Sequence, residues 1–402
     1  MYFKCDLDET TASALNRESG RIYTRTLAEH YRIFRKHNLW LSQAQGEKLI
    51  DAYEAGIPRL LHAHSVDAAQ QGFYKACKMA RANRHQGAHY PHKRKYYRTT
   101  IWKNTAIRQR GELLLLSLAR GLPEIEVNLS GHILDLGAVS FQEMRLVFNK
   151  ASKHYEWHLV VEDHLIPERK TEGGIAAGDL GEVHPIALTD GEAAAVISCR
   201  QLRAQNQHTN YILAQIQKKQ ACHQKHSRRW WRIERRKRRF LEKQALRKRD
   251  LEHKISHEVI EWCEEHQVRE LALGDVRDIA DGKRLRKEQQ QKISNWSHGK
   301  LRRYIQEKAQ RVGIRVMDDV DEAHTSRTCP FCSHQHKPQG RIYRCANPAC
   351  GAVAHRDVVG AANILSRHRF GTLARVQPPP PMYRHPVLRG KRSSVGHAGN
   401  SS

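Results

Sequence analysis

The sequence predicts an α/β protein of several domains, and three observations lead to this prediction. The chain has 402 residues, which corresponds to roughly two or three domains of ordinary size. Helical periodicity in the first part of the chain gives way to short β-rich segments. After these segments, helices alternate with single apolar strands, a pattern that is typical of parallel sheets covered by helices.

The net charge indicates the class of partner. The chain has 69 Lys and Arg against 42 Asp and Glu, a net charge of +27 at pH 7. Such an excess favours a polyanion, and nucleic acid is favoured over an acidic membrane surface because the charge is spread along the whole chain. No apolar run is long enough to span a bilayer, and the first residues lack the pattern of a secretory signal. We therefore expect a cytoplasmic protein with no membrane partner.

The first 165 residues combine a helical part and a β-rich part. Up to about residue 85, apolar residues recur at helical spacing after a short extended start. Between residues 88 and 165, aromatic and β-branched segments are separated by Gly and Pro turns, which predicts strands. A basic segment at 93–98 contains two tyrosines. It suits either contact with a nucleic acid or a solvated edge strand protected by lysines.

Residues 172–198 predict an antiparallel meander of three strands. Small residues around Asp179 form the first strand, residues 184–188 the second, and residues 193–198 the third. RNase H-like nuclease domains begin with such a meander and carry an acid in its first strand. An ordinary hairpin with a turn aspartate gives the same short pattern.

Residues 199–267 predict a long pair of helices with a strongly basic second member. Thirteen Lys and Arg stand against two Glu between residues 225 and 249, with tryptophans among them. We predict a buried stripe at Leu241, Leu246, Leu251, Ile255, Val259 and Trp262. Basic runs are commonly solvated helix faces, but the charge density and the tryptophans favour nucleic-acid binding here. The candidate contacts are Arg228, Arg229, Trp230, Arg235, Arg236, Lys237, Arg238 and Arg239.

The next part alternates strand, helix and strand. We predict strands at 268–276 and 313–317, a helix at 295–312, and a charged loop at 283–292. Carboxyl ends of parallel strands gather active-site groups. A last helix follows at 358–367, and the Pro-rich and Gly/Ser-rich residues from 371 onward predict disorder.

Four cysteines predict a structural zinc site. They form two pairs on either side of a short hairpin-like loop, Cys329 with Cys332 and Cys345 with Cys350. Four thiolates at this spacing close a tetrahedral Zn²⁺ site and leave no position for water. His334, His336 or His355 would be an alternative ligand to one thiol. The other five cysteines are scattered, which indicates a reducing compartment rather than a disulfide framework.

Acidic residues lie where the predicted strands and the last helix begin or end. They are Asp179, Asp275, the acidic run 318–322 and Asp357. Three or four carboxylates suit Mg²⁺, which prefers oxygen ligands, and two such ions promote hydrolysis of phosphodiesters. His355 and Arg356 are placed either to touch the scissile phosphate or to form an ordinary pair at a helix start.

Several motifs together resemble the transposon-encoded TnpB family. They are GDLG around Asp179, the strand that carries Asp275, NWSHGKL, TSRTCPFC and HRDVVGAANIL. The resemblance covers roughly residues 172–367. It implies an RNase H-like (RuvC) nuclease domain with a zinc-ribbon insertion, preceded by a β-barrel wedge and a helical recognition region. The implied domains are 1–165 (wedge and recognition), 166–325 (nuclease with a basic helical insertion), 326–354 (zinc ribbon), 355–370 (final nuclease segment) and 371–402 (tail).

The resemblance also implies a function. TnpB proteins are RNA-guided DNA endonucleases related to type V CRISPR effectors. The implied partners are a guide RNA from the transposon end and a double-stranded DNA target, the implied cofactors are two catalytic Mg²⁺ ions and one structural Zn²⁺, and the implied location is the bacterial nucleoid. Two alternatives are a nuclease-inactive RNA-guided DNA-binding protein and a DNA transposase that acts without RNA.

One departure from the family concerns the catalytic carboxylates. Gly274 stands where the family has a glutamate, in the sequence Gly274-Asp275-Val276. The missing carboxylate would come from Asp275 or from Glu322. We favour Glu322, because its longer side chain can reach from a displaced origin. The expected catalytic residues are therefore Asp179, Glu322 and Asp357, with Asp275 as the alternative to Glu322.

Overall fold

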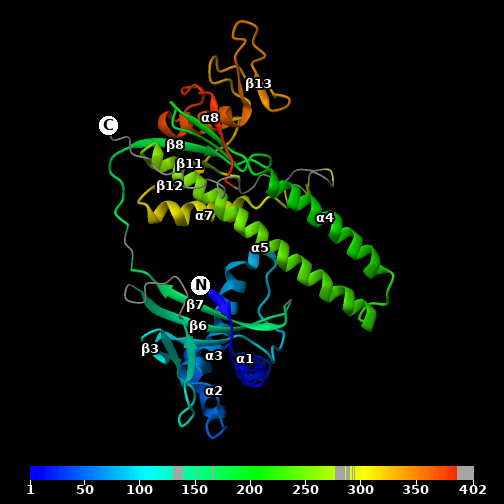
Figure 1. Cartoon of the computed structure of the whole chain (residues 1–402). Coiled ribbons are helices and arrows are strands. Elements are labelled where there is room, and N and C mark those ends of the chain that lie inside the picture. Colours follow the sequence, from blue (N-terminus) through cyan, green and yellow to red (C-terminus); the bar gives the residue numbers. More distant parts are fainter. Residues whose placement is uncertain are drawn as a thin grey trace, which may run out of the picture. The chain divides into compact units, whose positions relative to one another are not determined.

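The computed structural model describes residues 1–129, 139–150, 152–164, 167–276, 286, 290, 291, 293 and 295–386. The chain divides into two compact units, Met1–His164 and Leu165–Ser402 (Figure 1). Each unit is described by itself. None of the helices in the described ranges combines the length and the apolar character needed to cross a membrane.

The first unit contains three long helices followed mainly by strands. The helices are α1 (Glu9–His37), α2 (Gln43–Glu54) and α3 (Ala63–Ala82), with short 3₁₀ turns η1 (Arg84–Gln86) and η2 (Asn104–Ala106). Two of the helices begin at capping side chains, because Asp8 accepts a hydrogen bond from the Thr11 backbone N–H and Ser42 forms a capping box with Gln45. The strands are β1 (Tyr2–Lys4), β2 (Thr100–Lys103), β3 (Ile107–Arg110), β4 (Leu113–Leu116), β5 (Ile125–Asn128), β6 (Ser140–Asn149) and β7 (His154–Glu162).

Two antiparallel sheets of the first unit share one core with the helices. One sheet has the order β1-β7-β6-β2 and the other β3-β4-β5. Trp102 and Trp157 are fully buried in this core, with ring centroids 5.8 Å apart. Helical residues at the start and β-rich residues after 100 are thus confirmed.

The basic segment 93–98 forms neither a helix nor a strand but runs along α1. The Lys95 backbone N–H donates to the Thr24 hydroxyl, and Gly20 leaves room for the backbone of Tyr96. Arg98 turns inward, where it lies over the Tyr23 ring and donates to a backbone carbonyl of α3. The edge-strand interpretation is therefore wrong, and Arg98 has a structural role.

The second unit contains the remaining elements. Its helices are α4 (Arg200–Ala221), α5 (Arg228–Glu265), α7 (His298–Arg311) and α8 (Arg356–Phe370). Its strands are β8 (Gly174–Asp179), β9 (Ile186–Thr189), β10 (Ala194–Ile197), β11 (Val268–Gly274), β12 (Arg315–Val320), β13 (Ile342–Arg344), β14 (Val353–His355) and β15 (Pro381–Arg384).

Six strands of the second unit form one sheet in the order β12-β11-β8-β9-β10-β15. The predicted meander is present, because β8, β9 and β10 are antiparallel neighbours. The predicted alternation is also present, because β11 pairs in parallel with both β8 and β12. The parallel pairing brings the carboxyl ends of β8, β11 and β12 to one edge of the sheet.

Helices cover both faces of this sheet, with α8 on one face and α5 and α7 on the other (Figure 1). Successive residues of a strand point to opposite faces. Leu271 and Leu273 accordingly pack with α5 and α7, whereas Ala272 between them packs with α8. The fold is α/β with several parts, as predicted.

Two predictions about the second unit are wrong. Leu246 is not part of the buried stripe on α5, because it is 46% exposed while the stripe from Leu251 onward is buried. The tail from 371 is not disordered up to residue 386, because β15 pairs in parallel with β10. Arg384 on β15 holds the strand by ion pairs with Glu258 and Glu265 on α5. Residues 387–402 and most of the predicted loop 283–292 lie outside the described residues, but residues 290 and 291 at its end are helical rather than part of a loop.

Candidate functional site

Asp179 lies at the carboxyl end of β8, where the parallel strands converge. Its neighbour Gly178 pairs in register with Leu273 of β11, so Asp179 and Gly274 lie at the same level of adjacent strands. The Asp179 carboxylate points toward α8. A Cβ atom on Gly360 of that helix would overlap Oδ2 of Asp179 and lie 3.0 Å from its Cγ. Only a glycine at position 360 leaves this space to the carboxylate.

Glu322 fills the space beside Gly274. A Cβ atom on Gly274 would lie 2.5 Å from both Cγ and Cδ of Glu322 and would overlap its Oε1. The side chain that Gly274 lacks is thus replaced in space by the carboxylate of Glu322, which follows β12. The two glycines, at 274 and 360, each make room for one carboxylate of the cluster.

Electrostatic effects connect three carboxylates, although their oxygens do not all lie within 4.8 Å of one another. Burial raises the pKa of Asp179 well above its usual range, and the charges of Glu322 and Asp357 raise it further. Burial also raises the pKa of Glu322 to about 7, with Asp275 adding to the effect. Asp357 lies in the first turn of α8, where the helix dipole favours a negative charge.

The carboxylate cluster fits hard divalent cations. Oε1 of Glu322 is buried and accepts no hydrogen bond from the described residues. Asp179, Glu322 and Asp357 are half-buried, and carboxylates that lie close together away from water repel each other unless a cation balances them. Mg²⁺ is bound in proteins by carboxylate oxygens together with water, so Asp179, Glu322 and Asp357 have the chemistry to hold it.

Asp275 lies next to this cluster but is held by an arginine. Arg302 of α7, whose side chain is 6% exposed, places Nη1 3.4 Å from Oδ1 of Asp275 and Nη2 2.6 Å from Oδ2 of Asp318. The charge of Glu322 raises the pKa of Asp179, and the charge of Asp275 raises the pKa of Glu322. Glu322 fills the space beside Gly274, and Asp275 pairs with Arg302.

The four predicted cysteines form one cluster. Their sulfur atoms all lie within 4.8 Å of one another. Sγ of Cys329 is 3.9 Å from Sγ of Cys350, and Sγ of Cys332 is 3.6 Å from Sγ of Cys345. Zn–S distances of about 2.3 Å place sulfurs of a tetrahedral site about 3.8 Å apart. The cluster could thus bind zinc with its four thiolates, and no histidine belongs to it among the described residues.

Local turns aim the thiols at one point. Ser333 and Gly351, each one residue after a cysteine, have left-handed backbones with φ of 62° and 55°. The Cys332 pKa falls to about 7, mainly because the His334 backbone donates to the sulfur, whereas burial raises the pKa of Cys345 to about 12. A low thiol pKa favours the thiolate that a metal requires.

Asn363 connects the cysteine cluster to the carboxylate cluster. This residue of α8 is fully buried, and its Nδ2 donates to the backbone carbonyls of Thr325 and Thr328 at 2.7 and 2.8 Å. The bridged segment lies between Glu322 and Cys329. Val359 of α8 also packs against Cys329 and Tyr343. Disruption of the cysteine cluster would therefore be expected to displace α8, and with it the nearby carboxylates.

The basic start of α5 exposes most of its predicted contacts. Lys237 and Arg238 pair with Glu234, and Arg238 lies 5.9 Å from the centre of the Trp231 ring. The structure brings no carboxylate of the described residues to the other predicted arginines, which are exposed: Arg228, Arg229, Arg235, Arg236 and Arg239. Trp230 is half-buried and packs edge-to-face on Trp231. These arginines can contact phosphates without breaking an ion pair.

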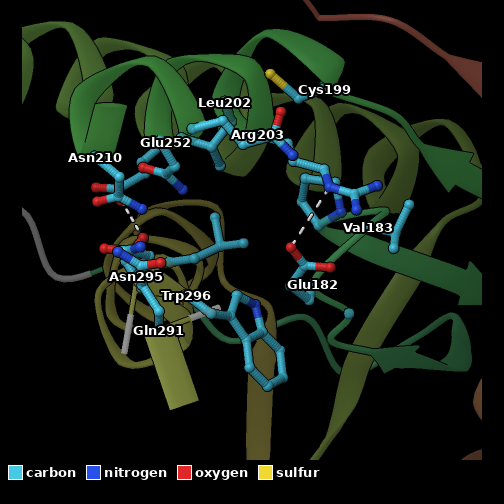
Figure 2. Close-up of a pocket in the computed structure, with 16 residues that line it drawn as sticks. Glu182, Val183, Cys199, Leu202, Arg203, Asn210, Glu252, Gln291, Asn295 and Trp296 are labelled. Carbon is cyan, nitrogen blue, oxygen red and sulfur yellow. Dashed lines mark hydrogen bonds and ion pairs between the residues drawn. The ribbon is translucent and has the colours of Figure 1, made fainter. Parts of the chain in front are cut away.

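A partly open pocket of about 200 Å³ lies between α4, α5, the loop before β9 and the start of α7 (Figure 2). Its walls carry Leu202 and Trp296 together with amide side chains such as Asn206 and Asn210. Arg203 pairs with Glu182 across its rim, with Nε 3.6 Å from Oε1. The lining contains none of the clustered carboxylates, so this pocket is separate from them.

Sequence reasoning missed four residues that shape the site. They are Gly360, Asn363, Arg302 and His184. A polar asparagine in the apolar run VVGAANIL was the one available signal, because a buried amide needs fixed partners. The contacts of the other three depend on chain segments far away in the sequence.

Comparison with known proteins gives two matches to family models. The model described as "Cas12f1-like, TNB domain" matches residues 298–364, and the model described as "Probable transposase" matches residues 158–280. Their ranges cover α4, α5, α7, most of α8 and most of the six-stranded sheet. Apart from the first residues of the second match, both ranges fall on the unit that holds the clusters.

One curated relative and one solved structure are also similar. A TnpB-like protein of Methanocaldococcus jannaschii is 31% identical over 121 residues, which are 29% of this chain and 42% of that protein. The match thus spans less than half of that relative. A solved complex of Cas12f1 with sgRNA and target DNA is 14% identical, with a TM-score of 0.57, and covers 87% of this chain and 81% of that chain. At this identity the likeness shows the fold alone.

Proposed function

We propose that this chain, which belongs to the TnpB family, is an RNA-guided DNA endonuclease. The observation that carries the proposal is that Gly274 and Gly360 leave space for the carboxylates of Glu322 and Asp179, with Asp357 in the first turn of the same helix as Gly360. The order and directions of the strands support an RNase H-like nuclease fold for the second unit. The two sheets of the first unit support a β-barrel wedge with an inserted helical recognition region.

Asp179, Glu322 and Asp357 would hold two Mg²⁺ ions. When bound, such ions activate water and stabilise the leaving oxygen in phosphodiester hydrolysis. The chain's own residues prepare the site. Gly274 and Gly360 leave space for the carboxylates, the sheet and α8 bury them, and Arg302 holds Asp275 beside Glu322. Asp275 would thus tune the charge of Glu322 rather than replace it.

The expected partners are a guide RNA from the transposon end and a double-stranded DNA target. The net charge of +27 supports a nucleic-acid partner. The likeness of the fold to a complex of Cas12f1 with sgRNA and target DNA supports both kinds of nucleic acid. The exposed arginines of α5 are the proposed phosphate contacts, and Cys329, Cys332, Cys345 and Cys350 would hold a structural Zn²⁺ ion.

A nuclease-inactive RNA-guided DNA-binding protein is the second candidate. Gly274 favours it, because the family's glutamate is missing from that position. The retained carboxylates and the fit of Glu322 beside Gly274 favour the nuclease. A transposase that acts without RNA is favoured only by the description of one family model.

The deciding experiment is cleavage of a supercoiled plasmid by protein co-expressed with its transposon-end RNA, in Mg²⁺. We expect wild type to cut, Asp179→Ala and Glu322→Ala to lose activity, and Asp275→Ala to retain part of it. Asp319→Ala is a matched control, because Asp319 is an exposed carboxylate on β12. Wild type that binds the target and never cuts would support the inactive binder. Purified protein without bound RNA would favour the transposase.

A further inference from the structure

A pocket beside Asp357 has the charge and the rings to hold a nucleotide. It has a volume of about 560 Å³ and is lined by His184, Ser198, Arg200, Arg341, Ile342, His355, Tyr383 and His385. A neighbouring pocket along α4 shares His184, Arg200 and Arg341 and adds Arg203. None of the described residues that line the two pockets is acidic. Ligand atoms of His184 and His355 lie within 4.8 Å of a carboxylate oxygen of Asp357, so the pocket adjoins the carboxylate cluster.

Positive charge at the pocket favours an anion. Nη1 of Arg341 lies 2.9 Å from Nε2 of His184. His184 is 6% exposed, and its other ring nitrogen, Nδ1, has no hydrogen-bond partner among the described residues. His184, His355 and Asp357 have a spacing that also suits a metal ion, but a guanidinium at His184 opposes a cation and attracts a phosphate.

The start of α4 adds to this charge. Arg200 is the first residue of that 22-residue helix, and Cys199 before it provides no side-chain cap. Free backbone N–H groups at a helix start attract anions. Arg200 is exposed and pairs with no carboxylate among the described residues. A phosphate in the pocket would therefore meet two arginines and a helix start.

The C-terminal strand β15 supplies the aromatic wall. Tyr383 is 49% exposed, and its ring centroid lies 6.0 Å from those of His184 and His355. The rings of Tyr383 and His385 are almost parallel, at 12°, with centroids 6.5 Å apart. Carbon contacts of about 3.5 Å on each face mean that a planar base between two rings needs about 7 Å. The rings of Tyr383 and His385 are thus separated by nearly the space that one base needs.

We propose that Tyr383 on β15 and His385, which directly follows that strand, stack on a base of the DNA strand to be cut, while Arg200 and Arg341 hold its phosphate next to Asp357. This inference rests on the proposed function, because it takes DNA as the substrate. It assigns a substrate-binding role to the segment that follows α8. Stacking on an aromatic side chain tolerates every base, as a nuclease whose specificity lies in base pairing requires.

The test measures binding of a fluorescent single-stranded oligonucleotide that is not complementary to the co-expressed RNA, with Ca²⁺ in place of Mg²⁺ so that it stays intact. We expect Tyr383→Ala to weaken binding about 5- to 150-fold, the range that corresponds to loss of one base stack. Tyr383→Phe keeps the ring and should bind within about twofold of wild type. Met382→Ala is the matched control, because Met382 is the adjacent exposed residue of β15 and does not line the pocket.

Equal binding by wild type and Tyr383→Ala would overturn the proposal, and so would a loss in Met382→Ala as large as that in Tyr383→Ala. If Tyr383→Ala does not fold, photocrosslinking of the wild-type protein tests the proposed contact instead. An oligonucleotide that contains 5-iodouracil should crosslink to the peptide with Tyr383 and His385, and crosslinks confined to other peptides would contradict the pocket. The proposed function is tested separately by plasmid cleavage. If the wild-type protein binds DNA through Tyr383 but never cuts it, the proposed nuclease activity is wrong and the proposed DNA-binding pocket still holds.

Discussion

The cysteine cluster and the carboxylate cluster are neighbours in space and are built in opposite ways. All four cysteines come from one segment between residues 329 and 350, and local turns aim their sulfurs. The carboxylates come from residues 179, 322 and 357, on different elements, and sheet register brings them together. The first cluster is therefore a property of a short sequence, and the second is a property of the whole sheet.

This difference decides how each site tolerates change. A local site depends on each ligand, because turn geometry leaves no substitute nearby. A dispersed site can take a carboxylate from another strand, provided that a small residue makes room. Gly274 and Glu322 show this, since the carboxylate of one position fills the side-chain space of the other.

The largest expected effect is on the local site. Cys345→Ser should reduce the zinc content from one ion per chain to about none, because structural zinc binding is worth on the order of 10–16 kcal/mol and needs every thiolate. Zinc content is measured by plasma mass spectrometry. Cys222→Ser is the matched control, since Cys222 is exposed and outside the cluster. A fully zinc-loaded Cys345→Ser would show that the cluster is not as local as described.

The next effect tests whether the dispersed site can be rebuilt. Glu322→Ala should lower the rate of plasmid cleavage on the order of 10³-fold, equivalent to about 4 kcal/mol of lost stabilisation of the transition state. The double variant Gly274→Glu with Glu322→Gly should recover part of that rate, because it moves the carboxylate to the other strand. If the double variant folds and keeps its zinc but does not recover cleavage, a glutamate at position 274 cannot replace the one at position 322.

A smaller effect is expected from one methyl group. Gly274→Ala places a Cβ where Glu322 now lies and should push the carboxylate away, with a loss of cleavage on the order of 10²-fold. Single-turnover rates measure this loss. Gly299→Ala is the control, since a Cβ there meets nothing within 4 Å. Unchanged cleavage by Gly274→Ala would show that Glu322 is not needed in its present place.

The smallest effect is that of pH on the dispersed site. The pKa of Glu322 is raised to about 7. Without metal, protonated Glu322 therefore contributes fully to the free energy of unfolding below its ordinary pKa of 4.5. This contribution is lost as the pH rises through 7. Mg²⁺ requires the ionised form, so its apparent affinity should fall about tenfold for each pH unit below 7. Melting temperatures with and without Mg²⁺ between pH 5.5 and 8.5 measure both trends. In Glu322→Gln, the melting temperature with and without Mg²⁺ should depend less on pH. A pH profile identical to that of wild type would show that Glu322 is not the group that titrates.

The sequence allowed a better prediction of the local site than of the dispersed one. Cysteine spacing alone named all four ligands, because ligand spacing and turn residues lie in the same segment. The acids could be named as well, but their convergence depends on pairing between β8, β11 and β12. Spacing could not show that Gly360 adjoins Asp179, since these residues belong to distant elements.

Two errors have the same origin. Leu246 fits the helical period of the stripe on α5, yet its side chain is 46% exposed rather than buried. The tail was predicted to be disordered from its prolines and glycines, yet β15 finds an open edge at β10 and an ion-pair partner in α5. Composition describes a segment alone, and both outcomes depended on a neighbour.

The order in which the carboxylates occur along the chain has a consequence for protein synthesis. Chains are made from the N-terminus, and early parts fold first. Asp179 is made early, but α8 with Asp357 and the strand β15 come near the end. A nascent chain on the ribosome therefore lacks one of the proposed catalytic carboxylates until Asp357 has been translated. The first unit and the arginines of α5 are made before the proposed catalytic site is complete.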